Sequence, residues 1–199
     1  MATFAGLDTY TFPGFDKMQW LKSHTNLMWT GFYLAPAPHH PDTSWMPSFA
    51  PDGYRNALAQ LGWGFAPIYV GRQAGDALLG AGQGTADGAD AANLAVSAGF
   101  APLATIYLDI ELGGALPDEM LDYYAAWVQS ILDSGLKPGV YCSHTSALQL
   151  ALRDNRAQIW VWKLNLYNPE DAHNPYPAPA PSDSGYNDAK RNAGAARHD

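Results

Sequence analysis

The stretch Ala104-Thr-Ile-Tyr-Leu-Asp-Ile-Glu111 decides the fold of this chain, and it carries the acids Asp109 and Glu111. In a β-strand, successive side chains point to opposite faces. One face is then aliphatic, and the other carries Tyr107, Asp109 and Glu111, with both acids at the carboxyl end. Two carboxyl groups on one face repel each other, so the less solvated one is expected to keep its proton. A carboxyl general acid needs that property near neutral pH.

The alternative is an edge strand whose acids simply face solvent. Two features of the sequence argue against it. No charged residue occurs from Ala104 to Leu108, and Gly113-Gly114 ends the strand abruptly, as a barrel strand ends at a loop.

Strands and helices alternate along most of the chain. Strands are predicted at 4–10, 29–35, 65–71, 104–111, 137–143 and 158–165, and helices at 16–26, 54–61, 89–98, 117–134 and 145–153. The glycine-rich stretch 71–88 is predicted to be a long loop. Such alternation is typical of a parallel sheet with helical crossovers, either doubly wound or closed into a barrel.

Aromatic residues favour the barrel. They recur on the face opposite the aliphatic one: Tyr33, Tyr69, Tyr107, Tyr141, Trp160 and Trp162. An open sheet covered on both faces would be aliphatic on both. We therefore predict an α/β fold of the TIM-type (β/α) barrel, incomplete or irregularly closed at its C-terminal end, with its site at the carboxyl ends of the strands. The barrel is predicted over 1–168, and the Pro- and Asn-rich stretch 169–199 as a tail that wraps it or is partly disordered.

The composition excludes several partners. The net charge of −8, with no run of Lys or Arg, argues against nucleic acid. No stretch is long enough to cross a membrane and no signal peptide is recognised, so we expect a protein that is cytoplasmic as synthesised, with a leaderless route as the alternative if it is exported. Cys142 has no partner for an internal disulfide, and its outward position on a strand makes it a poor nucleophile. We expect a monomer that uses no cofactor.

An ordered set of motifs resembles the glycoside-hydrolase-like family DUF1906, which is typified by a mycobacterial envelope protein and related to the lysozyme-like barrels of glycoside hydrolase family 25. The motifs are Gly-Leu-Asp-Thr-Tyr (6–10), Trp-Thr-Gly-Phe-Tyr-Leu (29–34), Ala-Pro-Ile-Tyr-Val-Gly (66–71), Ile-Tyr-Leu-Asp-Ile-Glu (106–111), Gly-Val-Tyr-Cys (139–142) and Trp-Val-Trp (160–162). The resemblance implies a barrel with acids at Asp8, Asp109 and Glu111, and Glu111 as the proton donor. A further acid that the related enzymes carry near their last strand has no counterpart after Pro181.

The first functional hypothesis is hydrolysis of an N-acetylated, peptidoglycan-like cell-wall polysaccharide. Glu111 would protonate the leaving oxygen, while Asp109 or Asp8 would stabilise the oxocarbenium-like state, attack it, or orient the substrate's acetamido group. Gln73 is predicted to bind sugar hydroxyls. The predicted aromatic platform comprises Tyr10, Tyr33, Tyr69, Tyr107, Tyr141, Trp160 and Trp162.

Two alternatives stay open. A non-catalytic barrel that binds glycans or a protein would keep the same surface without the full set of acids. A metal-dependent hydrolase would use Asp8, Asp109 and Glu111 as oxygen ligands for Mg²⁺ or Ca²⁺. His39 and His40 do not support a metal site, because they are adjacent on a loop and are predicted to be solvated. No metal is therefore assigned.

Overall fold

The computed structural model of the protein describes residues 5–46, 53–111 and 114–162. One six-stranded sheet has all its strands parallel and in sequence order. The strands are β1 (Ala5–Leu7), β2 (Leu27–Tyr33), β3 (Gly64–Tyr69), β4 (Thr105–Ile110), β5 (Lys137–Ser143) and β6 (Gln158–Trp162). The helices between them are α1 (Phe15–His24), α2 (Gly53–Gln60), α3 (Ala81–Ser97), α4 (Asp118–Asp133) and α5 (His144–Arg153).

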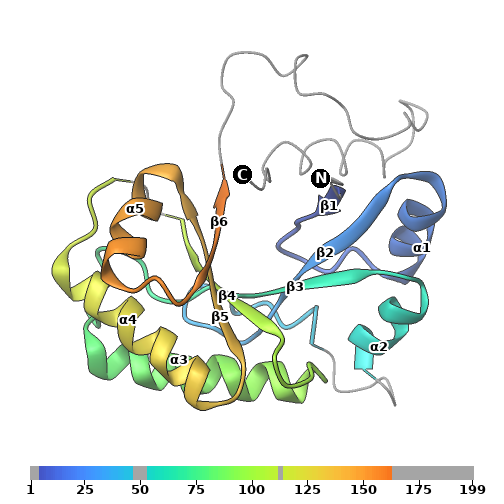
Figure 1. Ribbon diagram of the computed structural model, residues 1–199. Helices are drawn as coiled ribbons and strands as arrows, with labels where there is room; N and C mark the ends of the chain where they lie inside the picture. The colour runs from blue at the N-terminus through green and yellow to red at the C-terminus, as the bar shows by residue number, and fades with distance from the viewer. Residues whose placement is uncertain (1–4, 47–52, 112–113, 163–199) are drawn as a thin grey trace.

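The sheet is curled into a half-barrel (Figure 1). Trp29 of β2 and Trp160 of β6 meet across its concave face, with ring centroids 5.1 Å apart. Within the described residues, β1 and β6 remain the two edges of the sheet, so the predicted closure into a full barrel is not observed there. The predicted α/β class, the parallel sheet and the barrel-like curvature are confirmed. The predicted tail at 169–199 lies outside the described residues.

The aliphatic face of β4 packs against the helices. Ile106, Leu108 and Ile110 are completely buried, and α3 and α4 lie side by side along this layer (Figure 1). Burial of such side chains contributes about 1.5–3 kcal/mol each. The opposite face of β4 is therefore the one that points into the half-barrel, as the alternation predicts.

The predicted loop over 71–88 is too long: residues 71–80 contain no helix or strand, but α3 begins at Ala81 and not at 89. Its glycines serve close packing against α4. A Cβ atom at Gly84 would lie 2.1 Å from the carbonyl oxygen of Tyr123, and one at Gly88 would lie 2.6 Å from the Cβ of Ser130. Glycine lowers helix propensity by about 1 kcal/mol relative to alanine, and here tertiary packing overrides that preference.

Among the described helices, none combines the length and the apolar character needed to cross a bilayer.

Candidate functional site

Three acids lie at the carboxyl ends of the strands. Asp8 directly follows β1, Asp109 is the last residue but one of β4, and Glu111 follows that strand. Gly31 of β2 makes room for the first of them, since a Cβ atom there would lie 2.9 Å from Asp8 Oδ1. The carboxyl end of a parallel barrel-type sheet is where such folds place their active sites. We call this group of three acids the acid end.

Asp8 is anchored by a tyrosine of the neighbouring strand. The hydroxyl group of Tyr33 donates a 2.8 Å hydrogen bond to Asp8 Oδ1. Burial raises the pKa of Asp8, the hydrogen bond from Tyr33 opposes this, and repulsion from Glu111 adds to the increase. Asp8 is therefore held in place but is a weaker acid than an ordinary aspartate.

Asp109 is the most deeply buried of the three, with only 1% of its surface exposed. Burial raises its pKa well above the usual range, and repulsion from Glu111 and Asp8 raises it further. Its Oδ1 atom has no hydrogen-bond partner among the described residues. These effects all favour the neutral carboxyl.

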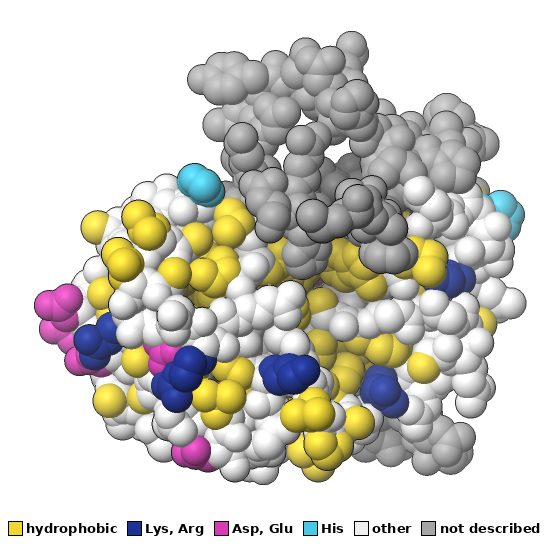
Figure 2. Space-filling view, viewed as in Figure 1, with side chains coloured by type: hydrophobic (Ala, Val, Ile, Leu, Met, Phe, Trp, Pro, Cys, Tyr) yellow, Lys and Arg dark blue, Asp and Glu magenta, His cyan; other side chains and the backbone are white. Residues whose placement is uncertain are grey.

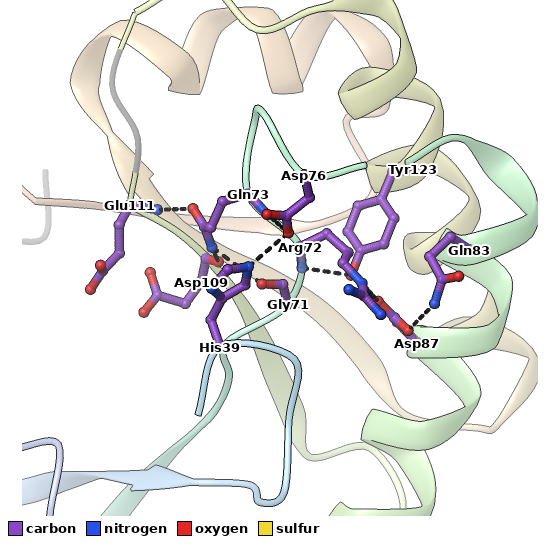
Figure 3. A network of polar contacts seen from close by, with 10 residues as sticks. All are labelled: His39, Gly71, Arg72, Gln73, Asp76, Gln83, Asp87, Asp109, Glu111 and Tyr123. Carbon is purple, nitrogen blue, oxygen red and sulfur yellow. Dashed lines mark hydrogen bonds and ion pairs between the residues drawn. The ribbon is translucent and has the colours of Figure 1, made fainter. Parts of the chain in front are cut away.

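Glu111 is exposed, in contrast to the two aspartates. Figure 3 shows its side chain and that of Asp109 projecting to the same side of β4. The acid that resists losing its proton is thus Asp109, together with Asp8. Glu111 is the acid that a ligand from solvent can contact, and its role as proton donor stays a prediction.

Gln73 fixes the end of β4 from the loop that follows β3. Its Nε2 donates to the carbonyl oxygen of Asp109 at 2.9 Å, and its Oε1 accepts from the N–H of Glu111 at 3.0 Å. Nε2 also lies 3.4 Å from the carbonyl oxygen of Gly71. The predicted role in binding sugar hydroxyls remains untested, but both ends of the amide are engaged by the main chain.

A wider polar network holds the Gln73 loop (Figure 3). Asp76 accepts from the N–H of Gln73 at 2.9 Å and lies 2.7 Å from Nε2 of His39, which follows β2. On the other side, the N–H of Arg72 donates to the hydroxyl of Tyr123 in α4. The loop is therefore tied to the segment after β2, to the end of β4 and to α4 at once.

A second anchor of this loop is Asp87 of α3. Its carboxylate accepts hydrogen bonds from Tyr123 at 2.8 Å and from Gln83 at 2.6 Å, and the guanidinium of Arg72 lies 3.5 Å away. Asp87 is buried, and these three groups compensate its desolvation. Sequence analysis did not single out these residues, because they come from separate elements.

Three of the predicted aromatic residues lie near the acids. Tyr33 bonds Asp8, and the pKa of Tyr141 is raised by burial and then by the negative potential of Asp8, Asp109 and Glu111. Tyr10 is 49% exposed, with its ring centroid 6.0 Å from that of Tyr33. These tyrosines are placed where a ligand of the acid end could contact them.

Tyr69 lies on the other face of its strand, so its predicted position in the platform is wrong. Its hydroxyl donates a 3.0 Å hydrogen bond to Asp90 of α3, and the side chain is 1% exposed. Ile68, its neighbour, points into the half-barrel, where it lies near Gly31. Tyr69 therefore belongs to the layer between sheet and helices.

Two further predicted aromatics lie toward the other end of the strands. Tyr107 and Trp160 face the half-barrel interior, 5.4 Å apart between ring centroids, and line a cavity toward the amino ends of the strands. Trp162 ends β6, but its side chain lies outside what the structure describes. The expected single platform is thus divided between two ends of the sheet.

His40 is buried, which corrects the prediction that both loop histidines are solvated. Its ring stacks on Tyr33 with centroids 4.5 Å apart and lies 4.1 Å from Tyr10. Burial lowers its pKa, so the ring is neutral near pH 7. No signal in the sequence distinguishes it from His39, which is exposed.

The metal alternative gains no support from the donor arrangement. Within the described ranges, no group of three or more His, Cys, Asp or Glu side chains is arranged to hold a metal ion.

Cys142 is buried on the helix side, and burial raises the pKa of its thiol to about 12. A thiolate nucleophile is thereby disfavoured at this position.

Comparison with known proteins adds a family and a fold. The model of the Rv2525c-like, glycoside hydrolase-like domain matches residues 19–196. An uncharacterised B. stearothermophilus protein is 20% identical, with a TM-score of 0.63 over 81% of this chain and 76% of that one. The Mycobacterium tuberculosis Tat-secreted protein Rv2525c, solved with HEPES, is 19% identical, with a TM-score of 0.55 over 83% of this chain and 80% of that one. A search of curated proteins finds no match.

Proposed function

Because the chain belongs to the Rv2525c-like, glycoside hydrolase-like domain family, we propose that its acid end binds and hydrolyses an N-acetylated cell-wall polysaccharide. The observation that carries this proposal is the electrostatic coupling of Asp8, Asp109 and Glu111 at the carboxyl edge of the half-barrel. Glycoside hydrolysis requires carboxyl groups of which one holds a proton while another is charged.

The proton belongs to the acid cluster as a whole. Mutual repulsion and burial raise the pKa of Asp8 and of Asp109, so the three acids together keep a proton at a higher pH than separate carboxyls would. Glu111 is the exposed member and the one that a glycosidic oxygen can reach. We therefore assign proton donation to Glu111, with Asp8 and Asp109 as the less accessible members of the cluster.

The tyrosines provide the binding surface in this proposal. Tyr10 is half exposed, while Tyr33 and Tyr141 are buried beside the acids. Tyrosine combines a flat apolar ring with a hydroxyl group that forms hydrogen bonds, and a pyranose ring presents both kinds of surface. The polysaccharide would contact Tyr10 first and extend toward Glu111.

A non-catalytic glycan-binding protein is the second candidate, and one observation favours it. The carboxyl group of Asp109 is covered, with 1% exposure. Hydrolysis with two carboxyl groups flanking the scissile bond requires both to reach the sugar. If Asp109 stays covered when the glycan binds and Asp8 does not take its place, the acid end would bind without turnover.

Reducing ends released from peptidoglycan and from chitooligosaccharides distinguish the two functions. We expect Glu111→Gln to lower turnover by about 10²–10⁴-fold, the usual contribution of a general acid, while glycan binding is retained. Glu119→Gln, which removes an exposed acid in the first turn of α4, is the matched control and should be unchanged. Binding without release by the unsubstituted protein would establish the binder, and the absence of both would overturn the proposal.

A further inference from the structure

A cavity of about 390 Å³ lies at the other end of the half-barrel from the acids. It is lined by residues from the amino-terminal parts of β2, β3 and β4, together with Trp160 of β6. Its volume is within the range of small-molecule sites, about 300–1,000 Å³. This cavity is not used by the proposed function.

The cavity exists because β3 and β4 separate toward their amino ends. These strands pair only at Ile68–Tyr107 and Tyr69–Leu108, whereas β4 and β5 pair at six positions from Thr105–Lys137 onward. Continued pairing would place Ala66 opposite Thr105, but both line the cavity instead. Pro67 directly precedes the paired residue Ile68 in β3. Proline has no N–H group, so it cannot donate a hydrogen bond to a neighbouring strand.

Aromatic rings form the walls. On the concave side, the ring of Trp160 lies 5.1 Å from Trp29 and 5.4 Å from Tyr107, both in edge contacts at 79° and 75°. On the helix side, the rings of Phe65 and Phe100 are 6.0 Å apart at 80°. A flat apolar body entering between these two groups would meet ring faces and ring edges on both sides.

The cavity lining includes a positively charged side chain, Arg55. The guanidinium of Arg55 in α2 lies 5.4 Å from the ring centroid of Phe100 and 5.8 Å from that of Phe65. Its only hydrogen bond joins it to the adjacent Asn56, and its buried Nε has no partner among the described residues. No carboxylate of those residues pairs with it either. Within that part of the chain this half-buried cation has no counter-charge, which favours an anion beside it.

We propose that this cavity is a binding site for a small aromatic carboxylate, whose ring lies between the two aromatic walls and whose carboxylate pairs with Arg55. Phe65, Trp29 and Thr105 are half-buried, so solvent reaches the site at its rim, while Trp160 and Phe100 close it inside. The site shares no lining residue with the acid end, and the two regions adjoin where the ring of Trp160 lies 4.6 Å from that of Tyr141.

The test is a titration with 2-naphthoate, followed by tryptophan fluorescence and calorimetry, with 2-naphthamide as the uncharged ligand of matched shape. We expect 2-naphthoate to bind saturably at one site. The affinity should fall about tenfold or more in Arg55→Gln, and 2-naphthamide should bind the unsubstituted protein more weakly than 2-naphthoate by a similar factor. A factor of this size corresponds to one charge-assisted hydrogen bond. Arg153→Gln, which removes an arginine paired with Asp122 on another surface, should leave binding unchanged. Unfolding curves check that each variant is folded.

A second variant keeps the inference testable if Arg55→Gln does not fold. Ala104→Trp fills the half-buried rim of the cavity without changing its charge, and we expect it to abolish binding. Asp109→Asn should bind 2-naphthoate normally, which separates this site from the acid end. Absence of saturable binding to the unsubstituted protein, or equal affinity for carboxylate and amide, would overturn the inference.

Figure 2 shows hydrophobic side chains reaching the surface along the middle of the molecule, with Lys and Arg side chains at several points on either side. The protein as a whole is acidic, with a net charge of −8. A small anion therefore depends on a local cation such as Arg55 for its attraction.

Discussion

The carboxyl group of Asp109 is almost fully covered, and its charge would be repelled by Glu111 and Asp8. Its raised pKa has a defined consequence for stability. An aspartate whose pKa is higher in the folded than in the unfolded protein binds more protons when folded, in the pH range between the two values. The free energy of unfolding therefore falls as pH rises through that range and stays low above it.

Asp109→Asn should remove this pH dependence. The amide has the same shape but no charge to desolvate, so we expect the variant to be more stable than the unsubstituted protein near pH 8, by about 1–3 kcal/mol. Near pH 4, where Asp109 is neutral when folded, the two proteins should differ little. Urea unfolding at both pH values measures this, and greater stability of the unsubstituted protein at pH 8 would contradict the burial argument.

Residue alternation predicted which side chains share a face of β4 but not how deeply each is buried. Tyr107, Asp109 and Glu111 do share the concave side, as the period of two requires. Asp109 is covered and Glu111 exposed because β4 ends between them, at Ile110. The end of a strand depends on its neighbours in the sheet, which one sequence does not reveal.

At the scale of elements, α3 and α4 pack more closely than two helices with ordinary side chains could. Gly84→Ala should destabilise the protein by about 2 kcal/mol or more, because the new methyl group would lie 2.1 Å from the Tyr123 carbonyl oxygen and the helices must move apart. Gly82→Ala is the matched control in the same helix, since nothing lies within 4 Å of its Cβ position.

The control should change stability in the opposite direction. Alanine at position 82 improves helix propensity, by roughly 0.5–1 kcal/mol. Thermal and urea unfolding of the pair would show opposite signs. Equal effects at the two positions would mean that the close approach of α3 and α4 does not determine stability.

The loop after β3 fixes the end of β4 through Gln73. Gln73→Leu would leave the N–H of Glu111 and the carbonyl oxygen of Asp109 without this partner, so we expect a loss of about 1–2 kcal/mol in stability. Amide hydrogen exchange at Glu111 should become faster at the same time. Gln19→Leu, at an exposed site on α1, serves as the control. Unchanged exchange at Glu111 would show that Gln73 does not hold the strand end.

The helices and strands themselves were largely predictable from hydrophobic period and from glycine and proline positions, apart from α3 and the exact ends. Tyr69 was misplaced because both faces of β3 are apolar or aromatic, so alternation alone does not tell which face turns inward. Its partner Asp90 belongs to the following helix. Such contacts between elements become visible only once the fold is known.

For the whole molecule, the parallel half-barrel follows from the repeated order of strand and helix, and the fold directs the search for a site to its carboxyl end. The sequence did not predict that β3 and β4 separate toward their amino ends, because this depends on which residues face one another across the sheet. The two ends of the sheet consequently differ: the carboxyl end carries the three acids, and the amino-end cavity is lined by aromatic residues and Arg55. The proposed functions assign different ligands to them.

The most direct test of the central claim is backbone amide NMR during a titration with chitotetraose, in the unsubstituted protein and in Glu111→Gln. We predict saturable shifts at the acid end, at Asp8, Tyr33, Asp109, Glu111 and Tyr141, with none around Arg55. Shifts confined to the amino-end cavity, or no saturable shift at the acid end, would contradict the claim that glycans bind there.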